Sequence, residues 1–202
     1  MKLRAASRHQ GFTLMEILIV ITIIASLVGI TAAAATMMQK KARRLKADAQ
    51  VSSITLGLEK YKQEYSEFPA PIGNEKAEFN GLSYTVSGAR MLYQALSGDG
   101  TNAIRGLTGR PSNGQLNESR DGEVFLSSAD PANTAAGMVA KIGDSNNYFL
   151  QDPFEKPYQY KSREGSNTNE ADLHNPETYD LWSFGYDDSG NGSEAERWIT
   201  NW

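Results

Sequence analysis

Two hydrophobic patterns follow one another in the first third of the chain. The first is residues 17–38, which contain no charged residue and no proline. As a helix rising about 1.5 Å per residue, this segment would cover about 33 Å, close to the thickness of the hydrocarbon core of a bilayer. We therefore predict a transmembrane helix over residues 12–38.

The second pattern is amphipathic and covers residues 39–68. Its apolar residues recur at alternating spacings of four and three, which places them in one stripe along a helix: Ala47, Val51, Ile54, Leu58, Tyr61, Tyr65 and Phe68. A single helix from about Phe12 to Tyr65 is expected, because the first prolines are Pro69 and Pro71. The stripe can pack on a sheet or form a coiled coil with a partner, and we favour the sheet because barely three heptads are present.

The rest of the chain predicts a small sheet after a loop-rich region. Residues 69–150 are rich in glycine, asparagine and serine, with one short helix expected at 90–96. Residues 151–202 contain alternating patterns at 158–161 and 178–185, typical of strands. The predicted fold class is α+β, with the long N-terminal helix packed on a small antiparallel sheet.

Charge is distributed unevenly and limits the function classes. Residues 1–50 hold eight Lys and Arg against two Asp and Glu, whereas residues 51–202 hold twelve against twenty-two. An acidic domain of this kind argues against nucleic-acid binding, which requires basic surfaces. Lys2, Arg4 and Arg8 favour a cytoplasmic N-terminus, although a basic cluster at 40–46 follows the apolar segment on its other side. The chain has no cysteine and hence no disulfide.

Glu16 is the unusual residue of the apolar segment. A carboxylate at this depth is costly in a membrane unless it has a partner, so it indicates a function. If a peptidase cleaved after Gly11, the new α-amino group of Phe12 would be positively charged. Glu16 of a neighbouring subunit could then pair with that amine during assembly.

The run from Gly11 to Glu16, followed by the apolar helix, resembles the class III signal of type IV pilins and of type II secretion pseudopilins. The resemblance implies that a prepilin peptidase cleaves between Gly11 and Phe12 and methylates the amine of Phe12. It implies a cleaved leader at residues 1–11, a single-pass protein of the bacterial inner membrane and a periplasmic C-terminal domain. A plain signal anchor that happens to contain a glutamate is the alternative.

The C-terminal residues extend the resemblance. The sequence around Asp152-Pro153-Phe154, the run 180–185 and the final Asn201-Trp202 are similar to the major pseudopilin, the G subunit, of type II secretion systems. The resemblance implies a filament of identical subunits that works with minor pseudopilins and an inner-membrane secretion platform. Two alternatives stay open: a type IV pilus subunit, and a membrane-anchored periplasmic binding module.

An acidic, glycine-rich loop at 187–196 is a candidate calcium site. Asp187, Ser189 and Asn191 occupy alternate positions before Gly192, as the ligands do in the first half of an EF-hand loop. In the second half, Trp198 stands at the position of the bidentate glutamate. Glu194 or Glu196 must therefore complete any site. The resemblance implies one structural Ca²⁺ held by Asp187 and the backbone carbonyl near Phe184. A solvated acidic turn is the alternative.

Enzyme chemistry has little support in the sequence. His9 lies in the predicted leader, which leaves His174 as the single histidine of the processed chain. Without cysteine, no zinc ligand set or Cys-His pair can form, and a Ser-His-Asp arrangement would depend on His174 alone. We therefore predict a structural protein and not an enzyme.

Overall fold

The computed structural model describes residues 12–79, 81–107, 109–114, 122–131, 137–143, 146–163, 170–187 and 195–202. The chain divides into two compact units, residues 1–42 and 43–202. Helix α1 is assigned from Leu14 to Tyr65 and crosses the boundary between the units in the sequence. The predicted long helix and the predicted α+β fold class are confirmed.

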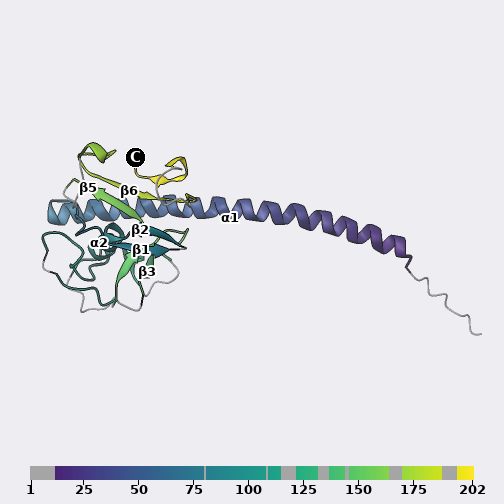
Figure 1. Ribbon diagram of the computed structural model, residues 1–202, viewed down its shortest axis with the longest axis horizontal. Helices are drawn as coiled ribbons and strands as arrows, with labels where there is room; N and C mark the ends of the chain where they lie inside the picture. The colour runs from purple at the N-terminus through teal and green to yellow at the C-terminus, as the bar shows by residue number, and fades with distance from the viewer. Residues whose placement is uncertain are drawn as a thin grey trace, which may run out of the picture. The chain divides into compact units, whose positions relative to one another are not determined.

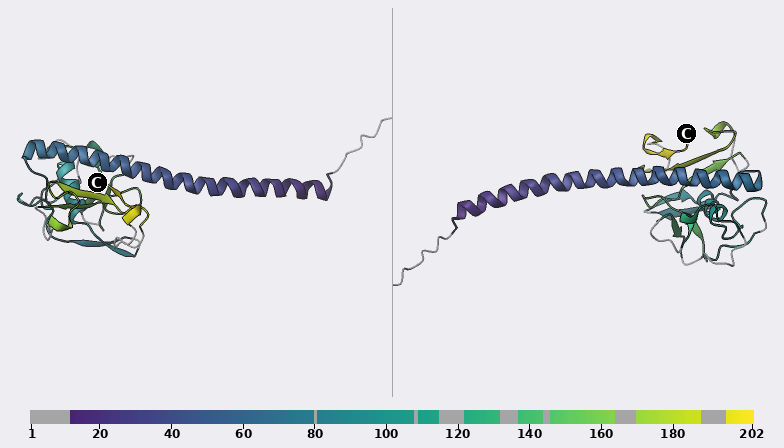
Figure 2. Two further views of the ribbon diagram at one scale, coloured as in Figure 1. Left: turned by 90° about the horizontal axis from the view of Figure 1, so that it is seen from above. Right: turned by 180° about the vertical axis from the view of Figure 1, so that it is seen from behind.

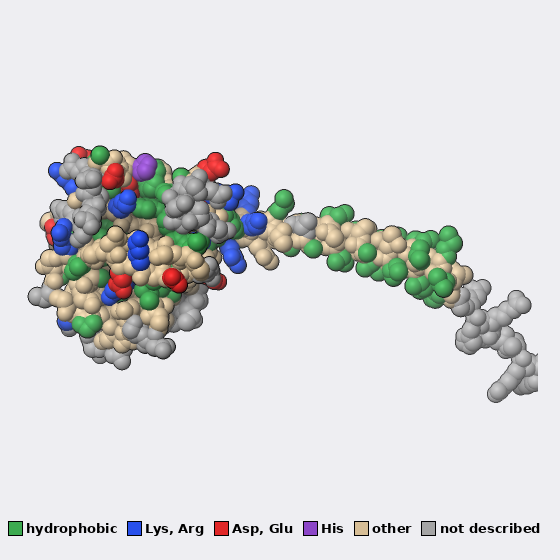
Figure 3. All heavy atoms as spheres, viewed as in Figure 1, with side chains coloured by type: hydrophobic (Ala, Val, Ile, Leu, Met, Phe, Trp, Pro, Cys, Tyr) green, Lys and Arg blue, Asp and Glu red, His purple; other side chains and the backbone are tan. Residues whose placement is uncertain are grey.

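In the first unit, helix α1 carries exposed apolar side chains along its length (Figure 3). It is the one helix among the described residues that is long and apolar enough to cross a membrane. None of its most apolar stretch is buried within the chain. An exposed apolar helix of this length needs a lipid or protein environment, because its apolar surface is unfavourable in water.

In the second unit, the apolar stripe of α1 forms one side of the core. Ala47, Val51, Ile54, Leu58 and Tyr61 are all buried, which confirms the interpretation of the stripe as a core seam over these positions. Tyr65 is 44% exposed and Phe68 packs at the edge of the cluster. The helix ends where Ser66 adopts a positive φ of 63° and its N–H bonds to the carbonyl of Lys62 at 2.8 Å.

Helix α2, Ser87–Ser97, lies almost completely inside the second unit. The sequence predicts its central part, 90–96, and the helix extends a little at each end. Gly98 ends it in the left-handed conformation, with φ of 72° and its N–H bonded to the carbonyl of Gln94. Glycine is required there, because a Cβ atom would lie 2.5 Å from the carbonyl oxygen of Gly122.

The strands form three small antiparallel sheets. The largest has the order β5-β6-β7, with bounds Gln159–Ser162, Tyr179–Ser183 and Ile199–Thr200. It corresponds to the sheet predicted from the C-terminal patterns. The other two are hairpins within the region predicted to be loop-rich: β1, Lys76–Phe79, with β2, Leu82–Thr85, and β3, Val139–Lys141, with β4, Tyr148–Leu150. Short 3₁₀ helices lie at Ser127–Ala129, Glu170–Asp172 and Ala195–Arg197.

Two tyrosines tie strand β5 and the residue just before it to α1 and to the segment that follows α1. The hydroxyl of Tyr158 donates to the side-chain oxygen of Gln50 at 2.9 Å, and the hydroxyl of Tyr160 donates to the carbonyl of Pro69 at 2.8 Å. Both tyrosine rings are buried in the main core. Figures 1 and 2 show the strands and α2 gathered along the second half of α1. These bonds hold the C-terminal sheet, which includes residues 180–183, against the helix and the residues just after it.

Candidate functional site

The first candidate site is the start of α1, where the predicted cleavage site lies. Phe12 is 84% exposed, and Gly11 lies outside the described residues. Oε2 of Glu16 accepts hydrogen bonds from the backbone N–H and the hydroxyl of Thr13, each at 2.8 Å. The N–H of Glu16 in turn lies 3.2 Å from the hydroxyl oxygen of Thr13. The two residues therefore form a capping box, with Thr13 as the N-cap.

This cap gives Glu16 a role within its own chain that the sequence analysis missed. The signal was present, because a threonine followed three residues later by glutamate, before an apolar run, predicts a capping box. Both side-chain bonds use Oε2, and Oε1 accepts no hydrogen bond from any residue that the structure describes. The carboxylate can therefore cap its own helix and still offer one oxygen to a partner.

The second candidate site is the segment around Asp187, which is fully buried. Its N–H donates to the carbonyl of Phe184 at 2.9 Å, and its Oδ2 accepts a bond from Nε1 of Trp198 at 3.0 Å. The other predicted calcium ligands, Ser189, Asn191 and Glu194, lie outside the described residues. Within the described ranges, no group of three or more His, Cys, Asp or Glu side chains could hold a metal ion.

A buried lysine holds the same segment. Lys156 is 5% exposed, and its ammonium donates to the carbonyl of Asp187 at 2.8 Å and to that of Gly185 at 3.1 Å. The turn that leads to the predicted calcium loop is thus already bound to one positive charge from the protein itself. Lys156 lies between Glu155 and Pro157, and nothing in this local sequence indicates that the lysine side chain turns inward.

Asp152 lies four positions before this lysine in the sequence and is also buried. Its Oδ1 accepts the N–H groups of Phe154 and Lys156, both at 2.9 Å, and its Oδ2 accepts the hydroxyl of Ser183 at 2.5 Å. Burial raises the pKa of Asp152 to about 6, although the Ser183 hydroxyl, the two backbone N–H groups and the nearby Lys156 ammonium all favour the charged form. This carboxyl therefore joins the 152–157 turn to strand β6.

His174, the single histidine of the predicted processed chain, has a structural role. Its Nδ1 lies 3.3 Å from Oδ2 of Asp180, and its exposed ring stacks on Trp202 with ring centres 4.2 Å apart. Asp180 also accepts the backbone N–H groups of His174 and Asn175. The carboxylate thus holds the chain at 174–175 in place, and the stack holds the C-terminal tryptophan.

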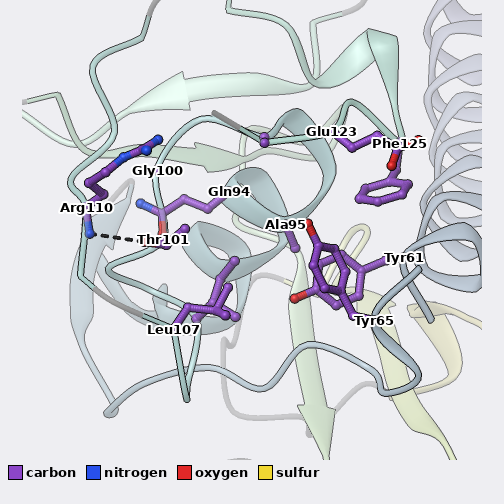
Figure 4. Close-up of a pocket in the computed structure, with 13 residues that line it drawn as sticks. Tyr61, Tyr65, Gln94, Ala95, Gly100, Thr101, Leu107, Arg110, Glu123 and Phe125 are labelled. Atoms are coloured by element: carbon purple, nitrogen blue, oxygen red, sulfur yellow. Dashed lines mark hydrogen bonds between the residues drawn. The ribbon is translucent and has the colours of Figure 1, made fainter. Parts of the chain in front are cut away.

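A pocket of about 200 Å³ opens beside the end of α1 (Figure 4). Its aromatic side is formed by Tyr61, Tyr65 and Phe125, with Tyr61 and Phe125 in an edge-to-face contact at 5.6 Å. On its polar side, Gln94 bonds to the side chain of Asn102 at 2.6 Å and to the backbone N–H of Ala103 at 2.7 Å. These bonds hold the loop after α2, and we assign no chemistry to the pocket.

A comparison with known protein families finds a match in the N-terminal region. A family model that describes the prokaryotic N-terminal methylation motif matches residues 6–32. The match spans the predicted cleavage site, the capping box and the first part of the apolar helix. It supports a type IV pilin-like protein and, with it, processing by a prepilin peptidase and assembly into filaments. Searches of the curated proteins and of the solved structures found no match.

Proposed function

We propose that this chain is the major subunit of a short periplasmic filament that drives type II protein secretion. The observation that carries the proposal is the methylation motif at residues 6–32 at the start of a long helix whose first part is apolar and exposed. A helix of this kind can be stored in the inner membrane and then packed against copies of itself when the filament forms.

In this proposal, cleavage between Gly11 and Phe12 creates the group that assembly needs. The α-amino group of Phe12, methylated and still positively charged, meets Glu16 of a neighbouring subunit in an apolar environment. Ion pairs are strong where water is excluded, so the pair would favour correctly registered subunits. Oε1 of Glu16 supports this role, since the capping bonds to Thr13 use Oε2 and no other described residue donates to Oε1.

The choice of a secretion filament over a surface pilus rests on the C-terminal segments that resemble the G subunit of secretion systems. Two of them, the 152–157 turn and the 180–185 run, are joined by the bond between Asp152 and Ser183. The final Trp202 packs edge-on against Trp182 at 5.9 Å. The quoted motifs therefore support one another physically in a single structural unit.

We also propose one structural Ca²⁺ in the loop after Asp187. The donors would be the Asp187 carboxylate and the Phe184 carbonyl, completed by Ser189, Asn191 and Glu194. These groups are hard oxygen donors, the kind of ligand that Ca²⁺ prefers. The ion would hold the acidic loop closed, next to the turn that Lys156 already fixes.

A gene deletion in the source bacterium tests the assignment. If the proposal is correct, proteins normally exported to the medium accumulate in the periplasm, while surface pili and surface motility persist. A plasmid copy of the gene restores export, and a copy with Gly11→Val does not, because it cannot be processed. Loss of pili with normal export would assign the chain to a type IV pilus. Normal export and normal pili would favour an anchored binding module.

A further inference from the structure

A collar of basic residues surrounds helix α1 just after the apolar stretch: Lys40, Lys41, Arg43, Arg44 and Lys46. All five are exposed. Lys41, Arg43, Arg44 and Lys46 form no ion pair with any other described residue. Five positive charges within seven positions repel one another, so the segment is expected to bind a polyanionic partner.

The arrangement of the charges around the helix indicates the shape of that partner. At about 100° per residue, the five side chains leave no gap wider than roughly 140°, and Ala42 and Leu45 occupy that gap. A docking patch for another protein would gather on one side of a helix. Charges on nearly every side suit an environment that surrounds the helix, as a layer of lipid headgroups does.

The position of the collar along the helix agrees with this. The uncharged residues 17–38 cover about 33 Å as a helix, so the collar begins where the segment would leave the hydrocarbon core. From Lys40 to Lys46 the helix rises about 9 Å, close to the roughly 5–8 Å depth of one headgroup layer. Lysine and arginine side chains at such a boundary reach into the headgroups with their charged ends.

The collar also ends where the folded domain begins. Ala47, directly after Lys46, is the first buried residue of α1 among those whose burial the structure describes. Figure 3 shows the blue basic side chains gathered at this place. The collar is therefore not used to build the core, and its charge is opposite in sign to that of the acidic residues 51–202.

From these observations we propose that residues 40–46 bind anionic phospholipid headgroups on the periplasmic face of the membrane before the subunit enters a filament. This inference rests on the proposed membrane insertion of residues 12–38. Bound lipid would hold the helix at a fixed depth and keep the positive collar away from the acidic domains of neighbouring subunits until assembly.

The test compares lipids bound to the full processed chain in nonionic detergent. The chain is mixed with equal amounts of phosphatidylglycerol and phosphatidylcholine, and native mass spectrometry measures the ratio of the two adducts. We expect at least a tenfold preference for phosphatidylglycerol, which raised ammonium acetate weakens. A collar variant with all five residues changed to glutamine should bring the ratio close to one.

A matched control separates the collar from overall charge. It removes five exposed lysines of the domain by the same change to glutamine: Lys60, Lys62, Lys76, Lys141 and Lys161. The control should keep the preference for phosphatidylglycerol. Equal ratios for the control and the collar variant would overturn the proposal. So would a collar variant that keeps the preference but loses crosslinking between subunits, because the collar would then serve a second copy of the chain.

Alkaline carbonate extraction of membranes distinguishes this inference from the proposal on which it rests. Wild-type chain that stays in the membrane but shows no lipid preference would overturn the collar alone. Wild-type chain released by carbonate would overturn the membrane insertion and the collar together.

Discussion

The carboxylate of Glu16 accepts hydrogen bonds from both the backbone N–H and the hydroxyl of Thr13, each at 2.8 Å. This bond pattern closes the first turn of a helix whose apolar surface is exposed. It means that replacing Glu16 removes a helix cap as well as a charge. A single substitution of Glu16 therefore cannot separate its internal role from a role in assembly.

Three variants together make that separation. Glu16→Gln keeps an acceptor for the Thr13 N–H but loses the charge, Thr13→Val keeps the charge but loses the hydroxyl, and Glu16→Ala loses both functions. Loss of the cap costs about 1 kcal/mol of helix stability. We expect Glu16→Gln and Glu16→Ala to reduce crosslinked oligomers in membranes roughly tenfold or more, whereas Thr13→Val stays near wild type. If Glu16→Gln gave the same amount of crosslinked oligomers as wild type, the pairing with the Phe12 amine would be ruled out.

The stability of the domain should depend on pH through Asp152. Its pKa is 3.8 in an unfolded chain and about 6 in the folded protein, so the folded state binds the proton more tightly. Between about pH 4 and pH 6 the folded state carries more protons than the unfolded state, and this group's contribution to stability falls as pH rises. Roughly two pKa units correspond to about 3 kcal/mol.

Urea unfolding of residues 43–202 from pH 4 to pH 7 measures this effect. Asp152→Asn keeps an oxygen that can accept the N–H groups of Phe154 and Lys156, and it does not titrate. The difference in unfolding free energy, wild type minus variant, should fall as pH rises through the window. The titration of the other carboxyl groups contributes equally to both proteins and cancels in this difference. A difference that does not change with pH would therefore show that burial does not raise the pKa of Asp152.

The ammonium of Lys156 should be needed for stability. Lys156→Met removes the donor to the carbonyls of Gly185 and Asp187 and takes the positive charge away from the buried Asp152. Breaking a buried charge interaction of this kind costs about 3–5 kcal/mol. Lys161→Met, at an exposed position of β5, is the control and should change stability by less than about 0.5 kcal/mol. Equal denaturation midpoints for the two variants would contradict the bonding described.

Calcium should raise the melting temperature of residues 43–202. A cation that binds only the folded form adds about 2.7 kcal/mol at a hundredfold excess over its Kd, and Mg²⁺ should do less because it demands stricter geometry. Asp187→Ala should abolish the response, and Asp172→Ala, an exposed acid in a 3₁₀ helix, should preserve it. Identical melting curves in millimolar Ca²⁺ and in chelator would leave the loop as a solvated acidic turn.

The long helix and the C-terminal sheet could be predicted because their signals are local and extended. The stripe from Ala47 to Tyr61 repeats over several turns, and strand β6 lies within the run 178–185 that was predicted as a strand. The hairpins β1–β2 and β3–β4 could not be predicted from the sequence, because their strands have only three or four residues and their pairing depends on contacts with the core. Phe79, for example, packs on Phe149, which is seventy positions away.

The features of the candidate sites also differ in whether they could be predicted from the sequence. The processing motif and Glu16 are readable because the residues are neighbours in sequence, and the capping box could have been read as well. The contact of Lys156 with the carbonyl of Asp187 joins positions 31 residues apart, and a lysine in a turn is ordinarily solvated. The burial of Asp152 depends equally on strand β6, which brings Ser183 to it.

Mass spectrometry of the N-terminus of protein isolated from membranes is the most direct test of the central claim, that this is a processed pilin-like subunit. The account predicts a chain that begins at Phe12, with a methylated α-amino group and without residues 1–11. A chain that begins at Met1 or Lys2, or one that begins at Phe12 with an unmodified amine, would contradict it.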